Sequence, residues 1–184
     1  MIRIISGERR GAKIATPDGD TTRPLRDRVR EALFNTLRGE LRGATVLDAF
    51  AGSGAVGFEA LSNGASRATF VESDKAALAV IRANAQKLRY ENQSTILEGT
   101  SPQVIATASK AERYSLLFLM PPYHSRLCEA VLNDEQVLQR VTSDALAVCE
   151  IHKEEPFALP VGWQVTKEKL YGITRLIFLA RKAS

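Results

Sequence analysis

The 184-residue chain contains only two cysteines and two histidines, and this scarcity limits what it can be. A disulfide framework needs more cysteines, so the pair favours a reducing compartment, and we expect a cytoplasmic protein. The four residues fall in no metal-ligand spacing, which argues against a zinc site. No run approaches the roughly 18 apolar residues of a membrane span. The charged start, MIRIISGERRGAK, lacks the apolar core of a signal peptide.

What is present is the composition of a globular domain, with 45% hydrophobic and 25% charged residues. This length supports one domain with a sizeable core. The net charge of +4 is uneven, because residues 1–43 hold 10 Lys and Arg against 6 Asp and Glu, and the remainder is neutral. A local basic excess favours a polyanionic partner bound through its phosphates. On charge alone, a solvated charged face explains it equally well.

Strand and helix patterns alternate after a short N-terminal arm, which we place at residues 1–23 and in which residues 1–16 predict a hairpin or an extended segment. A helix that begins at Pro24 opens the main domain, which we place at 24–184. The pattern predicts an open α/β sheet that is parallel except for an antiparallel C-terminal hairpin. The expected strands lie at 44–50, 68–72, 94–98, 115–119, 145–151, 163–171 and 173–181, and the expected helices at 74–90, near 101–110 and over about 125–140.

A glycine-rich turn, DAFAGSGAVGFEA, runs from the first of these strands into a helix. Gly52, Gly54 and Gly57 permit a tight turn and a close backbone approach, and the helix N-terminus offers unpaired N–H groups. The next strand ends in Glu72, where a carboxylate suits hydrogen bonding to ribose hydroxyls. Glycines used only for a structural turn are the alternative. The combination predicts a nucleoside-cofactor site.

The acid at the end of the first strand, Asp48, distinguishes between cofactors. A carboxylate there repels a pyrophosphate, but it can pair with the amino group of a methionine moiety. S-adenosylmethionine carries that amino group and no phosphate. It is therefore the cofactor that we expect, and NAD is the second choice.

A rigid corner, MPPY, follows the strand at 115–119. In open α/β sheets ligands bind at the carboxyl ends of strands, so this corner is expected beside the glycine turn. The Pro121 carbonyl can accept a hydrogen bond from an exocyclic amine. Tyr123 can stack on a base, an interaction worth roughly 1–3 kcal/mol. A Pro-Pro pair is commonly only a turn, so the functional interpretation depends on this position.

Together these residues resemble a known family. FAGSGAVGFEALSNGA, TRPLRDRVREALFNTL, the acid in VESD and the PPY corner are similar to the RsmD-type bacterial methyltransferases, which act on the N2 of a guanine in small-subunit (16S) rRNA. The resemblance spans nearly the whole chain and implies a class I, Rossmann-like methyltransferase fold with seven strands and a small N-terminal extension. It implies catalytic residues Met120, Pro121, Pro122 and Tyr123, and cofactor-binding residues Asp48, Phe50, Gly52, Ser53, Gly54, Glu72, Ser73, Gly99 and Thr100.

One position departs from that family pattern. Met120 stands where the family has Asp or Asn before PPY or PPF. In the family this side chain and the next carbonyl accept hydrogen bonds from the target amine and align its lone pair. A thioether is a weak acceptor, and the loss of one preorganised group typically costs on the order of 10²–10³ in rate.

The sequence therefore predicts an S-adenosylmethionine-dependent methyltransferase that acts on a guanine N2 of small-subunit rRNA or of its ribonucleoprotein particle. The target base would be flipped out or looped out. We expect a monomer, with no metal and no membrane. A non-catalytic rRNA or assembly-particle binder, supported by Met120, and an NAD-dependent oxidoreductase are the alternatives. The residues expected to contact RNA phosphates are Arg10, Arg23, Arg26 and Arg30.

Overall fold

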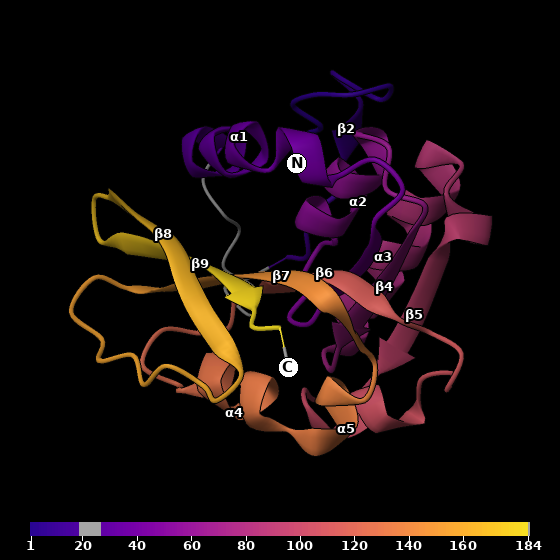
Figure 1. Ribbon diagram of the computed structural model, residues 1–184. Helices are drawn as coiled ribbons and strands as arrows, with labels where there is room; N and C mark the ends of the chain where they lie inside the picture. Colours follow the sequence, from indigo (N-terminus) through magenta and orange to yellow (C-terminus); the bar gives the residue numbers. More distant parts are fainter. Residues whose placement is uncertain (19–26, 184) are drawn as a thin grey trace.

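A seven-stranded sheet with helices on both faces forms the body of the protein (Figure 1). The structure is a computed structural model that describes residues 1–18 and 27–183. The strand order is β5-β4-β3-β6-β7-β9-β8; all neighbours are parallel except for β9, which runs antiparallel to β7 and β8. The strands are β3 (Thr45–Asp48), β4 (Arg67–Glu72), β5 (Ser94–Glu98), β6 (Tyr114–Leu119), β7 (Val141–His152), β8 (Trp163–Tyr171) and β9 (Thr174–Arg181). The predicted sheet and its C-terminal hairpin are confirmed.

The helices divide between the two faces because the strand residues alternate between two cores. Phe118 lies in a core shared with α1, α2 and α3, whereas its neighbour Leu119 lies in a core shared with α4 and α5. Figure 1 shows the same division, with α1 above the sheet and α4 and α5 below it. The helices are α1 (Asp27–Thr36), α2 (Ala55–Ser62), α3 (Lys75–Leu88), α4 (Leu127–Asn133) and α5 (Glu135–Leu138). Short 3₁₀ turns lie at Arg38–Glu40, Glu91–Gln93 and Gln103–Thr107.

The N-terminal arm forms a small antiparallel pair, β1 (Ile2–Arg3) and β2 (Lys13–Ile14), which confirms the predicted hairpin. Ile4 and Ile14 bury their side chains in the core beneath α1. The arm is therefore anchored by apolar contacts. The predicted boundary between residues 23 and 24, and the predicted start of a helix at Pro24, lie outside the described residues.

Two predicted helices are corrected by the structure. The helix expected over about 125–140 is two helices, because the Asp134 side chain accepts a hydrogen bond from the Val137 N–H (3.0 Å) and begins α5 there. The segment near 101–110 contains only a 3₁₀ turn. In the described part of the chain, no helix is long and apolar enough to cross a membrane.

The position of β3 decides where a ligand can bind. It pairs with β4 on one side and with β6 on the other, so the chain reverses its direction of winding between these neighbours. The carboxyl ends of strands at such a switch point diverge and leave a crevice. The glycine turn after β3, the acid that ends β4 and the corner after β6 all lie at this edge of the sheet.

Candidate active site

A cavity of about 1020 Å³ opens at the carboxyl ends of β3, β4 and β6. Its volume lies at the upper end of the range for small-molecule sites. All of the predicted cofactor-binding residues line it except Gly54, and so do the four residues of the Met-Pro-Pro-Tyr corner. The structure thus brings together two motifs that are about 70 positions apart in the sequence.

The glycine turn forms part of the cavity wall. Gly54 precedes α2 with φ at +82°, a conformation that favours glycine, and its N–H donates to the Ala51 carbonyl (2.8 Å). Gly57 lies against the Phe70 ring, and a Cβ there would come within 2.3 Å of it. Gly54 and Gly57 therefore shape the turn and its packing, whereas Gly52 lines the cavity itself.

Asp48 ends β3 inside the cavity and is only 2% exposed. Its carboxylate accepts a hydrogen bond from the Gly57 N–H (3.1 Å). Burial raises the pKa of Asp48 to about 7; the Gly57 bond opposes that shift, and the nearby charge of Glu72 adds to it. A cationic ligand group beside Asp48 would offset the cost of its buried charge.

Glu72 ends β4 and is held by backbone groups from two segments. One carboxylate oxygen, Oε2, accepts from the Gly52 N–H (2.8 Å), and Oε1 accepts from the N–H groups of Ser73 and Asp74 (both 2.9 Å). A carboxylate offers about four acceptor positions, so capacity remains for a ligand hydroxyl. These three bonds fix the carboxylate before any ligand arrives.

The charged residues of the cavity favour a cationic ligand. Asp48, Glu72 and Glu150 line it, and its described lining includes no Lys, Arg or His, although it includes Met1, whose N-terminal ammonium donates to the Thr16 Oγ1 (3.1 Å). Three carboxylates would repel a pyrophosphate, whereas they attract an ammonium or a sulfonium group. The electrostatics of the cavity therefore disfavour the NAD alternative.

The Pro-Pro-Tyr corner forms the wall next to β6. Met120 is half-buried and packs on the core shared with α1, and Pro121 is buried. The Tyr123 hydroxyl lies 2.7 Å from the Thr174 Oγ1 and 3.2 Å from the Glu150 Oε1. The Tyr123 ring also contacts the His152 ring edge-on, with centroids 5.5 Å apart. These contacts fix the direction of the Tyr123 ring.

Two side chains in the cavity wall were missed by the sequence reasoning. Ser101 is buried, and its hydroxyl donates to the Ala49 carbonyl (2.6 Å), which joins the loop after β5 to the glycine turn. Glu150 is 2% exposed and lies on β7. A signal for Glu150 existed, because it is the one acid in the apolar strand predicted at 145–151. No local signal distinguished Ser101.

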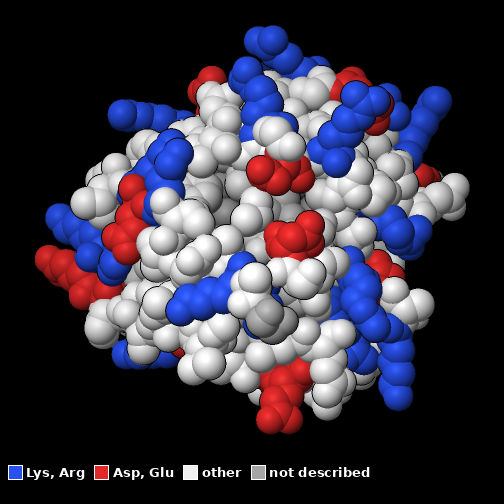
Figure 2. Space-filling model, viewed as in Figure 1, with Lys and Arg blue, Asp and Glu red and all other residues white. Residues whose placement is uncertain are grey.

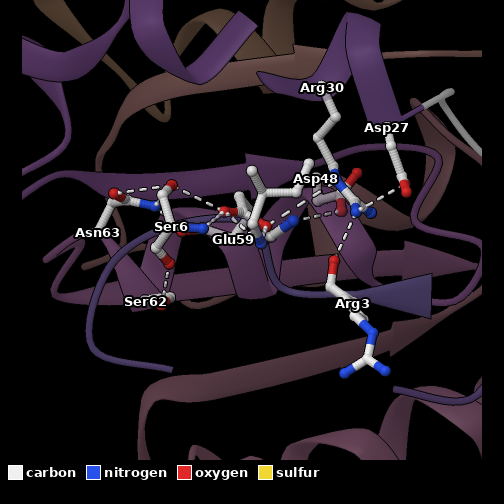
Figure 3. A network of polar contacts seen from close by, with 10 residues as sticks. Arg3, Ser6, Asp27, Arg30, Asp48, Glu59, Ser62 and Asn63 are labelled. Atoms are coloured by element: carbon white, nitrogen blue, oxygen red, sulfur yellow. Dashed lines mark hydrogen bonds and ion pairs between the residues drawn. The ribbon is translucent and has the colours of Figure 1, made fainter. Parts of the chain in front are cut away.

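The arm forms a further wall of the cavity and is held there by a buried polar network around Glu59 of α2 (Figure 3). The Glu59 carboxylate accepts from the N–H groups of Ile5 (2.9 Å) and Ser6 (2.8 Å) and from the Ser6 hydroxyl (2.9 Å). The Arg30 Nε of α1 lies 3.9 Å from it. The network therefore joins the arm, α1 and α2. The arm residues that line the cavity are Met1, Ile2, Thr16 and Pro17.

The same network corrects one predicted RNA contact. The Arg30 side chain is 0% exposed, and its Nη2 donates to the Arg3 carbonyl (2.6 Å) and to Asp27 (3.1 Å). Burial lowers the pKa of Arg30, and the charges of Glu59 and Asp27 act in the opposite direction. Arg30 is thus a structural residue, because its apolar position in α1 turns it inward.

Other basic residues of the N-terminal quarter do lie on the surface. Arg10 is exposed, whereas Arg23 and Arg26 lie outside the described residues. Figure 2 shows Lys and Arg side chains over the upper part of the molecule, where Figure 1 has the arm and α1, with Asp and Glu among them and further Lys and Arg around the rest of the outline. The exposed basic residues of the N-terminal quarter include Arg3, Arg10, Lys13 and Arg28.

Comparisons with known proteins agree with this geometry. The model of the family described as "Conserved hypothetical protein 95" matches residues 2–180. Ribosomal RNA small subunit methyltransferase D of Haemophilus influenzae is 35% identical over 173 residues, which cover 94% of this chain and 90% of that protein. The solved structure of yhhF, a methyltransferase candidate from Escherichia coli, superposes with a TM-score of 0.86 at 34% identity and covers 100% of this chain and 99% of that one.

A more distant structure shares the fold alone. SMU.776, a methyltransferase candidate complexed with SAH, has a TM-score of 0.63 at 15% identity, and the match covers 83% of this chain and 48% of that one. The predicted fold, a class I methyltransferase fold with an open and mostly parallel sheet, is confirmed.

Proposed function

The chain belongs to this RsmD family of methyltransferases, and from that premise we propose that it transfers a methyl group from S-adenosylmethionine to small-subunit rRNA. We further propose that the acceptor is the exocyclic N2 of a guanine. The observation that carries the proposal is that an acidic cavity of the cofactor type and a Pro-Pro-Tyr corner share one volume. A cofactor and a base can therefore meet there.

S-adenosylmethionine is the expected cofactor, and the residues present fit it. Asp48, buried with a pKa of about 7, suits its amino group, and Glu72 has acceptor capacity for its ribose hydroxyls. Gly52 and Ser53 would permit a close backbone approach to the amino-acid part, and Gly99 and Thr100, which also line the cavity, would border the adenine. When bound, this cofactor supplies an electrophilic methyl group on a sulfonium. The protein's task is then to present a nitrogen lone pair to that methyl.

The corner after β6 is the proposed site for the target base. A base must leave its stack to reach such a cavity. The Tyr123 ring is held at its hydroxyl by Thr174, so it can present a fixed face for stacking. The Pro121 carbonyl would accept a hydrogen bond from the amine and turn its lone pair toward the methyl group.

The exposed basic surface of the arm is the proposed path of the RNA. Arg10 lies there, and Arg23 and Arg26, outside the described residues, remain proposed phosphate contacts. Each phosphate contact releases counterions, so the affinity for RNA falls as salt rises. Arg10→Ala should make the negative slope of log affinity against log salt shallower by about 1. A slope that does not change would remove Arg10 from the RNA path.

Methyl transfer itself is the direct test. The chain is incubated with labelled S-adenosylmethionine and with small-subunit particles that lack the modification, and the labelled nucleoside is identified after digestion. Label on the N2 of guanine supports the proposal in full, and label on another base or atom refutes the guanine N2 assignment. Binding of cofactor without transfer to any rRNA substrate would favour a non-catalytic rRNA binder.

A further inference from the structure

The register of β6 and β7 brings a carboxylate next to Met120. Leu119 pairs with Cys149, so the residues that follow them, Met120 and Glu150, are neighbours at the carboxyl ends of the two strands. Leu119 and Cys149 both lie in the core shared with α4. Because side chains alternate along a strand, Met120 and Glu150 project from the opposite face, together.

Glu150 is placed to act inside the cavity. It is 2% exposed and lines the same volume as Met120, Pro121 and Tyr123. Its Oε1 lies 3.2 Å from the Tyr123 hydroxyl, on the residue that we propose stacks on the base. Glu150 therefore lies beside the proposed base site.

We propose that Glu150 supplies the carboxylate that aligns the target amine, in the place of the Asp or Asn that the family pattern has at position 120. This inference rests on the proposed methyl transfer. The carboxylate would come from β7 rather than from β6, and Met120 would fill the vacated volume as an apolar wall. The Pro121 carbonyl and Glu150 would then be the two acceptors for the two amine hydrogens.

The transfer balances with these groups alone. The lone pair of the amine nitrogen forms a bond to the methyl carbon, and the C–S bond breaks with its electron pair going to sulfur. Positive charge thus moves from sulfur to nitrogen, and sulfur leaves as a neutral thioether. The nitrogen then loses one proton, which Glu150 or water takes up. A carboxylate beside the nitrogen stabilises the charge as it develops.

The test compares five variants in single-turnover methyl transfer with small-subunit particles. Glu150→Ala should lower the rate on the order of 10²-fold, and Met120→Asp added to it should restore at least about a tenth of the wild-type rate. Glu129→Gln is the matched control, because Glu129 is a buried carboxylate on α4 that does not line the cavity. The rise in melting temperature on addition of cofactor shows that each variant folds.

Thr174→Val distinguishes an action on the amine from an action through Tyr123. It removes the contact between the Tyr123 hydroxyl and the Thr174 Oγ1 (2.7 Å), which is shorter than the contact with the Glu150 Oε1 (3.2 Å). If Glu150 only positions Tyr123, Thr174→Val should reduce the rate as much as Glu150→Ala does, and the inference is then overturned. A loss in Glu150→Ala that is much larger, and that Met120→Asp rescues, supports it.

The remaining outcomes also test the role of Glu150 and the proposed function. Glu150→Ala within about threefold of wild type overturns the inference. A wild-type chain that is inactive while Met120→Asp alone transfers label keeps the proposed function and overturns the role of Glu150. If neither transfers label, the proposed function and the inference fall together.

Discussion

Asp48, at the end of β3, and Glu59, on α2, are both buried carboxylates, but they differ in how many hydrogen bonds the chain donates to them. Glu59 accepts hydrogen bonds from three donor groups of Ile5 and Ser6 and faces the buried Arg30. Asp48, among the described contacts, accepts one from Gly57, and burial raises its pKa to about 7. The chain itself supplies the hydrogen bonds of Glu59, whereas the proposed cofactor amine would supply a partner for Asp48.

The difference assigns separate tasks to the two regions. The Glu59 region fixes the arm against α1 and α2, and so builds one wall of the cavity (Figure 3). Asp48 lies inside that wall, where burial makes its ionised form unfavourable. Stabilising hydrogen bonds thus lie beside the site, whereas the site itself holds a buried carboxylate whose electrostatic cost ligand binding would offset.

The largest expected effect comes from Glu59→Ala. The substitution leaves Arg30 without its buried partner and leaves two arm N–H groups unbonded, so the free energy of unfolding should fall by about 3–5 kcal/mol. Urea unfolding with and without cofactor measures it. Glu98→Gln, an exposed acid at the end of β5, is the control and should change little. A loss below about 1 kcal/mol would show that the arm is anchored by its apolar contacts instead.

Asp48→Asn should separate binding from folding. Asparagine keeps an acceptor for the Gly57 N–H but loses the charge, so affinity for S-adenosylmethionine should fall by about 2–3 kcal/mol, while the cofactor-free protein stays folded. Calorimetric titration near pH 8 measures the affinity. Unchanged affinity would mean that the cofactor amine does not pair with Asp48.

The pH dependence of stability gives a sharper form of the same comparison. The pKa of Asp48 is about 7 in the folded chain and about 3.9 in an unfolded one. Between these values the folded state holds the extra proton, so the Asp48 contribution to stability falls as pH rises, by about 1.4 kcal/mol per pH unit, and levels off above about 7. Unfolding of wild type and Asp48→Asn from pH 5 to 8 measures the difference.

Saturating cofactor provides the control for that slope. A bound ammonium stabilises the ionised carboxylate and lowers its pKa, so the wild-type slope between pH 5 and 7 should flatten. An equally steep slope in Asp48→Asn would assign it to another group.

The smallest expected effect is that of Ser6→Ala. The Ser6 hydroxyl is one of several donors to Glu59, so its loss should cost about 1 kcal/mol of unfolding free energy and leave cofactor affinity unchanged. Thermal unfolding and a binding titration measure the two quantities. A larger loss would mean that the donors to Glu59 act as one cooperative unit.

Much of the framework was predictable from local sequence. The strand at 94–98 has the predicted bounds, and the last two strands are confirmed to within one residue, because alternation and turn residues act locally. The N-cap of α3 was also predictable, since the Asp74 side chain accepts from the Ala77 N–H (2.8 Å). The predicted helix over 125–140 failed because Asp134 begins a new helix within an otherwise helical pattern.

The residues of the candidate site likewise divide into those that local sequence predicted and those that it did not. The sequence by itself determined the glycine turn, the acids Asp48 and Glu72 and the Pro-Pro-Tyr corner, because each depends on residues next to one another in the chain. Only the tertiary structure decided that Arg30 is buried and that Glu150 lies beside Met120. Both depend on helix packing and strand register, which bring distant residues together, and no local pattern encodes which face a charged side chain will turn to.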